Sequence, residues 1–194
     1  MITTVIASFD RAEQARVASR ELHQSGFMAE DVNVVLNDVR SRTEALTADP
    51  KTTGATKGAV AGGVVGGAAG VAATVAGLAI PGIGPIVAAG PIVAALAGAG
   101  TGAVAGGLIG ALADVGIEKG DAELYAESVR RGGSLVYVRT DQSRAEEATW
   151  CLRRAGAVDI RQRSQEWRAA GWKGYNPAAE PLSLEDIERE RRRY

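Results

Sequence analysis

The pattern of apolar and polar positions divides the chain into two ordinary flanks and an uncharged middle. In the first flank, residues 3–9 are rich in β-branched side chains and predict a strand, and residues 32–36 predict a second one. Residues 11–25 between them predict a helix with Asp10 as N-cap and Gly26 as its stop. The stripe that this helix should bury, at helical spacing, consists of Ala12, Ala15, Ala18 and Leu22.

The second flank repeats this order of elements. Asp121 is placed to cap a helix through about residue 131, which Gly132 would end. Residues 135–139 predict a strand, residues from 141 or 143 to 155 a helix, and residues 158–163 a last strand. Residues 10–15 are also echoed in composition by residues 143–148. The two flanks therefore predict an α+β, ferredoxin-like domain of the split βαβ type.

That fold has specific consequences for the sheet. Its first and third strands lie in the centre and its second and fourth at the edges, and Asp159, Arg161 and Arg163 suit an edge strand because charge discourages sheet-to-sheet pairing. The second and third strands are neighbours. A segment inserted between them must therefore leave and return at nearly the same place, as a hairpin.

The domain organisation follows from these boundaries. Residues 1–39 together with 118–168 form the α/β domain, 40–53 a connector, 54–116 a glycine-zipper helical hairpin, and 169–194 a linker with a short C-terminal helix. The hairpin helices are expected at about 55–79 and 91–114. Ser183 begins a capping-box pattern for the C-terminal helix, which either docks on a neighbouring subunit or stays solvated.

The middle of the chain carries the most distinctive signal. No charged residue lies between Gly58 and Ala113, and the 25 glycines are about twice the ordinary usage of about 7%. Glycines recur every fourth residue in two ladders, which consist of Gly58, Gly62, Gly66 and Gly70, and of Gly98, Gly102, Gly106 and Gly110. The helix-breaking turn expected between the two helices consists of Pro81, Gly82, Gly84 and Pro85.

Spacing by four places each ladder on one face of a helix. A glycine costs a solvated helix about 1 kcal/mol relative to alanine, so the ladders indicate close helix packing, as in small-xxx-small interfaces. A flexible linker is the disfavoured alternative, because linkers rarely avoid charge for so long. Self-association is expected in either of two settings, which both stay open: a lipid bilayer, which we favour slightly, and a soluble assembly with an all-protein core.

Composition argues against several other functions. The net charge of −1 favours neither nucleic acid nor an anionic surface. Cys151 and His23 are single residues of their kinds, so we expect no enzyme, no cofactor and no metal site. Residues 100–105 fit a dinucleotide fingerprint in letters only, since they lie within a predicted helix. Trp167 is expected to pack on the domain and Trp172 to anchor the tail. We expect no nucleic-acid partner.

The N-terminal residues lack the basic and long apolar regions of a secretory signal. We therefore expect a cytoplasmic protein that is not secreted, with the inner membrane as the alternative location if the hairpin enters lipid.

Several stretches together resemble a known family. They are residues 5–10, the helix 13–22 with Gly26 and Phe27, residues 79–85 with the ladders, and residues 128–133, 136–138 and 166–168. Over about residues 1–172 the chain resembles bacterial general stress proteins with the heat-induced YflT-type domain, in a version that carries a glycine-zipper insert. The resemblance implies stress-linked expression and brings no catalytic residues with it.

Three functional hypotheses result. The first is a non-enzymatic, stress-associated structural protein that forms homo-oligomers through the zipper hairpin, in or on a membrane. The second is a soluble homo-oligomer or filament. The third is a small-ligand-sensing module, because paired ferredoxin-like units often bind small molecules.

Overall fold

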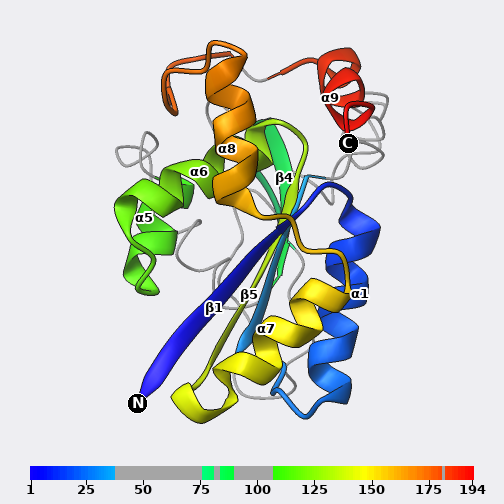
Figure 1. The fold of residues 1–194 in the computed structure, drawn as a ribbon, viewed down its shortest axis with the longest axis vertical. Coiled ribbons are helices and arrows are strands. Elements are labelled where there is room, and N and C mark those ends of the chain that lie inside the picture. The colour runs from blue at the N-terminus through cyan, green and yellow to red at the C-terminus, as the bar shows by residue number, and fades with distance from the viewer. Residues whose placement is uncertain (38–75, 81–83, 90–106, 181) are drawn as a thin grey trace, which may run out of the picture.

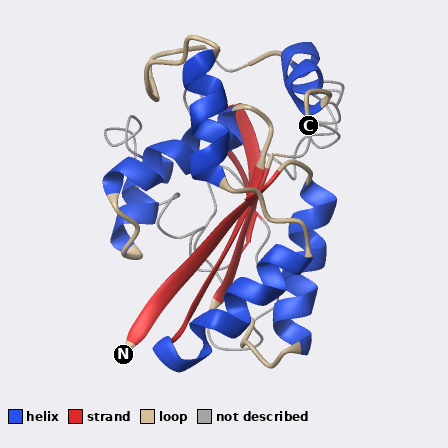
Figure 2. Ribbon diagram, viewed as in Figure 1, coloured by secondary structure: helices blue, strands red, loops and turns tan. Residues whose placement is uncertain are grey.

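The computed structural model describes residues 1–37, 76–80, 84–89, 107–180 and 182–194, of which 76–80 and 84–89 are described by their backbone. The fold is α+β (Figures 1 and 2). Its strands are β1 (Ile2–Phe9), β2 (Val32–Leu36), β3 (Ala76–Ile80), β4 (Gly84–Ala89) and β5 (Ser134–Asp141). Its helices are α1 (Ala12–Gln24), α5 (Gly107–Asp114), α6 (Lys119–Arg130), the short 3₁₀ helix η1 (Gln142–Arg144), α7 (Ala145–Arg154), α8 (Ile160–Ala169) and α9 (Leu184–Arg191).

The strands form one antiparallel sheet in the order β1-β5-β2-β4-β3. The central position of β5 follows from its sequence, since the run from Leu135 to Val138 is buried without a break. The expected adjacency of β2 and β5 is confirmed, and the chain between them leaves and returns on the same side of the domain. Two predictions are wrong: the first strand is not central, because β1 is the outermost strand, and β2 is not at an edge, because β4 pairs with its other side.

Helices cover both faces of the sheet (Figure 2). On one face, α1 and α7 pack against the odd-numbered residues of β1, such as Ala7 and Phe9. On the other face, α5, α6 and α8 enclose a second core with Ile6, Tyr137 and Trp167. Because side chains alternate along each strand, the sheet contributes side chains to two separate apolar cores.

The first helix confirms its predicted stripe and corrects its predicted cap. All four stripe residues, from Ala12 to Leu22, are buried, and Gly26 adopts φ +83°, the left-handed conformation that ends the helix. The N-cap is Arg11, whose backbone N–H donates to Gln14 Oε1 at 3.1 Å. Asp10 is thereby released for an ion pair elsewhere.

The predicted last strand over residues 158–163 is wrong. Val158 makes a single antiparallel bridge to Ser8, after which α8 begins. Asp159 causes the change, because its side chain accepts hydrogen bonds from the backbone N–H groups of Arg161 and Gln162 and so caps a helix. The buried residues of α8, namely Ile160, Ser164 and Trp167, recur at helical spacing.

The predicted helix over 55–79 is also wrong at its end, because residues 76–80 form β3. The chain does reverse between 80 and 84, as the Pro/Gly pattern predicts, but between two strands, with Ile80 opposite Gly84 and Ala79 opposite Pro85. The edge of β2 presents backbone N–H and C=O groups that need hydrogen-bond partners, and β4 provides these partners by pairing with it as a strand.

The helix predicted over 91–114 is confirmed for its C-terminal part as α5. Leu108, Ala111 and Leu112 are buried in the core beneath α6, so this part of the expected zipper segment also packs on the domain.

The C-terminal helix is confirmed at α9, and Ser183 caps it by accepting a hydrogen bond from the backbone N–H of Asp186 at 3.1 Å. It docks on its own chain, where Ile187 is completely buried. Trp167 packs on the domain as predicted, and Trp172 meets it edge-on with ring centroids 5.7 Å apart, which anchors the start of the tail.

Candidate functional site

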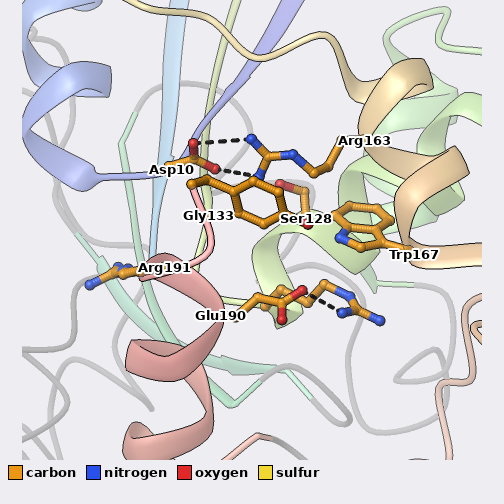
Figure 3. A pocket seen from close by; sticks show the side chains of 9 residues that line it. Asp10, Ser128, Gly133, Arg163, Trp167, Glu190 and Arg191 are labelled. Carbon is orange, nitrogen blue, oxygen red and sulfur yellow. Dashed lines mark hydrogen bonds and ion pairs between the residues drawn. The ribbon is translucent and has the colours of Figure 1, made fainter. Parts of the chain in front are cut away.

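A set of interacting polar side chains lies beneath α9, where the ends of several elements meet (Figure 3). We call this set the charged cluster. It consists of Asp10 after β1, Glu127, Arg130 and Arg131 at the end of α6, Arg163 of α8, and Glu190 and Arg191 of α9.

Glu127 is the centre of the cluster and is completely buried. Arg130 donates two hydrogen bonds to its carboxylate, at 2.9 and 2.8 Å, and Arg131 Nε donates a third at 2.7 Å. The hydrogen bond to Glu127 raises the pKa of Arg130. Burying a carboxylate is costly unless charged donors surround it. Both arginines therefore stabilise one buried acid at the point where α6 ends.

The same arginines extend the cluster to the C-terminal helix. Arg131 Nη1 donates to Glu190 Oε1 at 2.6 Å, and its guanidinium lies 4.9 Å from the ring centroid of Trp167. Arg131 thus contacts α6, α8 and α9 at once. It joins these three helices through one side chain.

Arg191 ties α9 to the sheet. Its Nη2 donates to the backbone oxygens of Gly132 at 2.7 Å and Asn37 at 3.1 Å. Asn37 follows β2, and its amide donates to Val129 O at 2.6 Å. Asn37, just after β2, is therefore held from two sides.

Asp10 and Arg163 form the upper part of the cluster in Figure 3. Arg163 donates to both carboxylate oxygens of Asp10, at 2.8 and 3.2 Å, which is a bidentate pair. The Arg163 guanidinium also lies 3.3 Å from the ring centroid of Tyr194. This ion pair connects the end of β1 to α8 and to the end of the chain.

An apolar contact lies beside these charges. Ile187 packs on Gly132, which adopts φ +95° at the end of α6. A Cβ at position 132 would collide with the Ile187 side chain, and the left-handed backbone also favours glycine there. Gly132 therefore ends one helix and makes room for another.

The space within the cluster is too small for a substrate. Asp10, Ser128, Trp167 and Tyr194 are among the residues that line a cavity of about 20 Å³, and a single water needs roughly 10–15 Å³. The acids and arginines described above engage one another. The arrangement can hold helices together.

A second hollow, of about 170 Å³, lies at the other end of the sheet. It is lined in part by Ile2, Met28, Asp31 and Arg139, together with Arg144. Arg144 stacks on the Phe27 ring at 4.0 Å and donates to Ser25 O at 2.7 Å. Small-molecule sites usually enclose about 300–1,000 Å³, so this hollow lends little support to ligand sensing.

The buried tyrosines near the cores are suited to stabilising the fold and not to acid–base chemistry at neutral pH. Burial raises the pKa of Tyr125 to about 12, assisted by nearby Asp121, and burial raises the pKa of Tyr137 to about 12. Both phenols stay protonated at neutral pH and cannot serve as bases there. Within the described residues, no group of three or more histidines, cysteines and acids is placed to hold a metal.

The single cysteine and the single histidine of the chain lie on α7 and α1. Cys151 is buried on α7, where its sulfur lies 3.4 Å from Ser25 Oγ, and His23 is exposed on α1. Neither contributes to the charged cluster.

Most of the predicted helix-packing glycines lie outside the described residues, namely Gly58, Gly62, Gly66, Gly70, Gly98, Gly102 and Gly106. Gly110 lies on α5, is exposed, and has open space where a Cβ would stand. Of the predicted turn residues, Gly84 and Pro85 begin β4, while Pro81 and Gly82 lie outside the described part of the chain.

Sequence reasoning missed the charged cluster. Its one local signal is the spacing of Glu127 three and four residues before Arg130 and Arg131, which predicts pairing along a helix. The cross-links to Glu190 and Arg191 have no such signal, because they join segments 59 and more residues apart.

No protein-family model, curated protein or solved structure matches the chain. In the part of the chain that the structure describes, no helix combines the length and the apolar character needed to cross a bilayer.

Proposed function

We propose that this chain is a non-enzymatic structural protein, stress-associated as its resemblance implies, that forms homo-oligomers through its two glycine ladders. The observation that carries the proposal is the uncharged run from Gly58 to Ala113 with eight glycines at four-residue spacing. Such spacing is typical of helices that approach each other closely. We favour association at a membrane, and an all-protein core in a soluble assembly is the alternative.

The α+β domain would serve as the support for this segment. We infer a split βαβ domain, because β1, β5 and β2 are adjacent in the order of that fold and α1 and α7 follow the first and third of its strands. Its fourth strand would be reduced to the bridge between Ser8 and Val158.

The anchoring of the C-terminal end of the segment supports this role. Leu108 and Leu112 of α5 are buried in the core of the domain. A segment fixed at one end loses less conformational entropy when it associates. Gly110, on an exposed part of α5, keeps one ladder position open for an approaching helix.

The test compares ladder variants with a matched control. Gly62→Leu and Gly106→Leu should each shift the native oligomer toward smaller species in light scattering, because a leucine side chain separates the packed backbones. Gly120→Leu is the control, since Gly120 is an exposed helical glycine outside the ladders with open space around it. A monodisperse monomer of 20.0 kDa for the unaltered chain would remove the proposal.

Flotation of a native lysate, before and after an alkaline carbonate wash, separates the two settings. Protein that rises with vesicles after the wash supports the membrane setting. A heavy, lipid-free particle supports the soluble assembly instead.

A further inference from the structure

The small cavity within the charged cluster borders a buried hydrogen-bond donor. Trp167 is 3% exposed, and its indole Nε1 has no hydrogen-bond partner in the part of the chain that the structure describes. The residue lines the cavity, and Figure 3 shows its ring reaching from α8 toward Ser128. A buried indole N–H usually donates a hydrogen bond, because leaving it unpaired is costly. The geometry therefore calls for an acceptor inside the cavity.

The two side chains that pack on the Trp167 ring do not supply this acceptor. Trp172 meets it edge-on with ring centroids 5.7 Å apart, and the nitrogen of an indole is a donor only. The Arg131 guanidinium lies 4.9 Å from the ring centroid, and it also only donates. A molecule bound in the cavity can provide what these neighbours lack.

The volume of the cavity decides how large that molecule is. The cavity measures about 20 Å³, whereas a single water needs roughly 10–15 Å³. There is room for one molecule of the size of water. The lining residues with acceptor oxygens, namely Asp10, Ser128 and Glu190, therefore border the same molecule as the Trp167 indole.

The charges around the cavity decide the chemical class of its occupant. The carboxylates of Asp10 and Glu190 repel an anion, and the guanidiniums of Arg131 and Arg163 repel a cation. These acids and arginines are already paired with each other, at 2.8 Å between Arg163 and Asp10 and at 2.6 Å between Arg131 and Glu190. The occupant that fits is neutral and both accepts and donates hydrogen bonds, as water does.

The acceptors in the wall keep capacity for another hydrogen bond. Ser128 Oγ shares one hydrogen bond with Ser8 Oγ at 2.6 Å, and a hydroxyl oxygen has two lone pairs. Glu190 Oε1 accepts from Arg131, and each carboxylate oxygen can accept a second donor. A buried water typically makes about three hydrogen bonds, so the cavity offers enough partners.

We propose that this cavity binds one water molecule, which accepts a hydrogen bond from Trp167 Nε1 and donates to the oxygens of Ser128 and Glu190. The water connects α8 to α6 and α9, the same three helices that Arg131 joins. It completes the hydrogen bonding of the charged cluster beneath the C-terminal helix. The site uses neither glycine ladder, so it is independent of the function proposed above.

A crystal structure of the full chain, grown with bromide in place of chloride, tests the site directly. We expect a peak of electron density about 2.7–3.2 Å from Trp167 Nε1, with no anomalous signal from bromide. An unfilled cavity would overturn the proposal. So would an anomalous peak there, because it would identify the occupant as a halide.

Nuclear magnetic resonance of the full chain, labelled with ¹⁵N at the indole nitrogens, tests the site in solution. The Trp167 indole proton should show cross-relaxation with water of the sign that a long-lived, bound molecule gives. Trp150, which is 57% exposed, is the internal control, because its indole meets only short-lived surface water. Trp167→Phe assigns the signal by removing it. Equal behaviour of the Trp167 and Trp150 signals would contradict the proposal.

Discussion

The two faces of the sheet are closed in different ways. On the α1 and α7 face, small apolar side chains such as Ala15, Ala18 and Ala148 let the helices lie close to the strands, and Leu22 and Leu152 fill the space between. On the α5, α6 and α8 face, an apolar core with Leu112 and Val129 continues into the charged cluster around Glu127.

The two faces therefore depend on different kinds of contact. The face covered by α1 and α7 is held mainly by apolar side chains, and such contacts tolerate replacement by other apolar groups of similar volume. The charged end rests on residues from β1, α6, α8 and α9, and each charge there depends on its partners. Removing an apolar group leaves a cavity, whereas removing one charge leaves another buried without a partner.

The largest effect is expected from Glu127→Ala. It leaves Arg130 partly buried without its acid and Arg131 with Glu190 as its remaining partner, which should lower the free energy of unfolding by about 3–5 kcal/mol. Equilibrium urea unfolding measures the change. Glu146→Ala, an exposed acid on α7, should cost less than about 0.5 kcal/mol. An equal loss of unfolding free energy in both variants would show that burial of Glu127 is not the reason for its contribution to stability.

The apolar face should respond to Leu22→Ala with a loss of about 2–5 kcal/mol, because a buried side chain is replaced by a cavity. Val17→Ala, on the outer side of the same helix, should cost far less. This loss should be insensitive to salt, because it involves no charge. A salt-dependent loss at Leu22 would remove the distinction between the two faces.

An intermediate and local effect is expected from Ile187→Ala. Loss of this buried side chain removes about 2 kcal/mol of apolar stabilisation from α9, so hydrogen exchange within Leu184–Arg191 should become about thirtyfold faster while the sheet stays protected. Glu185→Ala, on the exposed side of α9, should leave that exchange nearly unchanged. Faster exchange throughout the domain would instead place α9 within the main folding unit.

A further effect concerns pH. Burial raises the pKa of Tyr125 and Tyr137 to about 12 in the folded chain, against 10.0 for an ordinary tyrosine. Because the unfolded chain loses these protons first, the stabilisation is complete below pH 10 and should be lost as pH rises from 10 to 12. Urea midpoints across that range measure it, and Tyr137→Phe should make the decline shallower. An unchanged decline in that variant would assign the effect to other groups.

Much of the domain can be predicted from the sequence alone. The stripe of α1 repeats at helical spacing, the strands alternate, and Gly26 and Gly132 mark the helix ends where they are observed with positive φ. Ser183 likewise caps α9 as its capping-box pattern predicts. In each case the cause lies within a few residues of the effect, so the pattern carries the information.

In the incorrect predictions, by contrast, the cause includes contacts with residues far away in the sequence. Residues 76–80 read as the end of a Gly/Ala helix, yet they form β3 because β4 satisfies the edge of β2 and β3 in turn pairs with β4. Residues 158–163 alternate like a strand, and a single cap by Asp159 together with burial of Trp167 makes them the start of a helix. Propensity in such short segments is weak enough for tertiary contacts to override it.

The sequence by itself determined that the first flank is a strand–helix–strand unit and that the middle of the chain is an uncharged segment with two glycine ladders, because spacing and charge are properties of the chain. Only the tertiary structure decided that Glu127 is buried, that Arg131 joins α6, α8 and α9, and that the outer edge of β1 lacks its expected fourth strand. These three features depend on residues far apart in sequence being brought together. Local conformational preferences of about a few tenths of a kcal/mol per residue are too weak to specify these long-range contacts. Burial and charge pairing in the folded domain specify them.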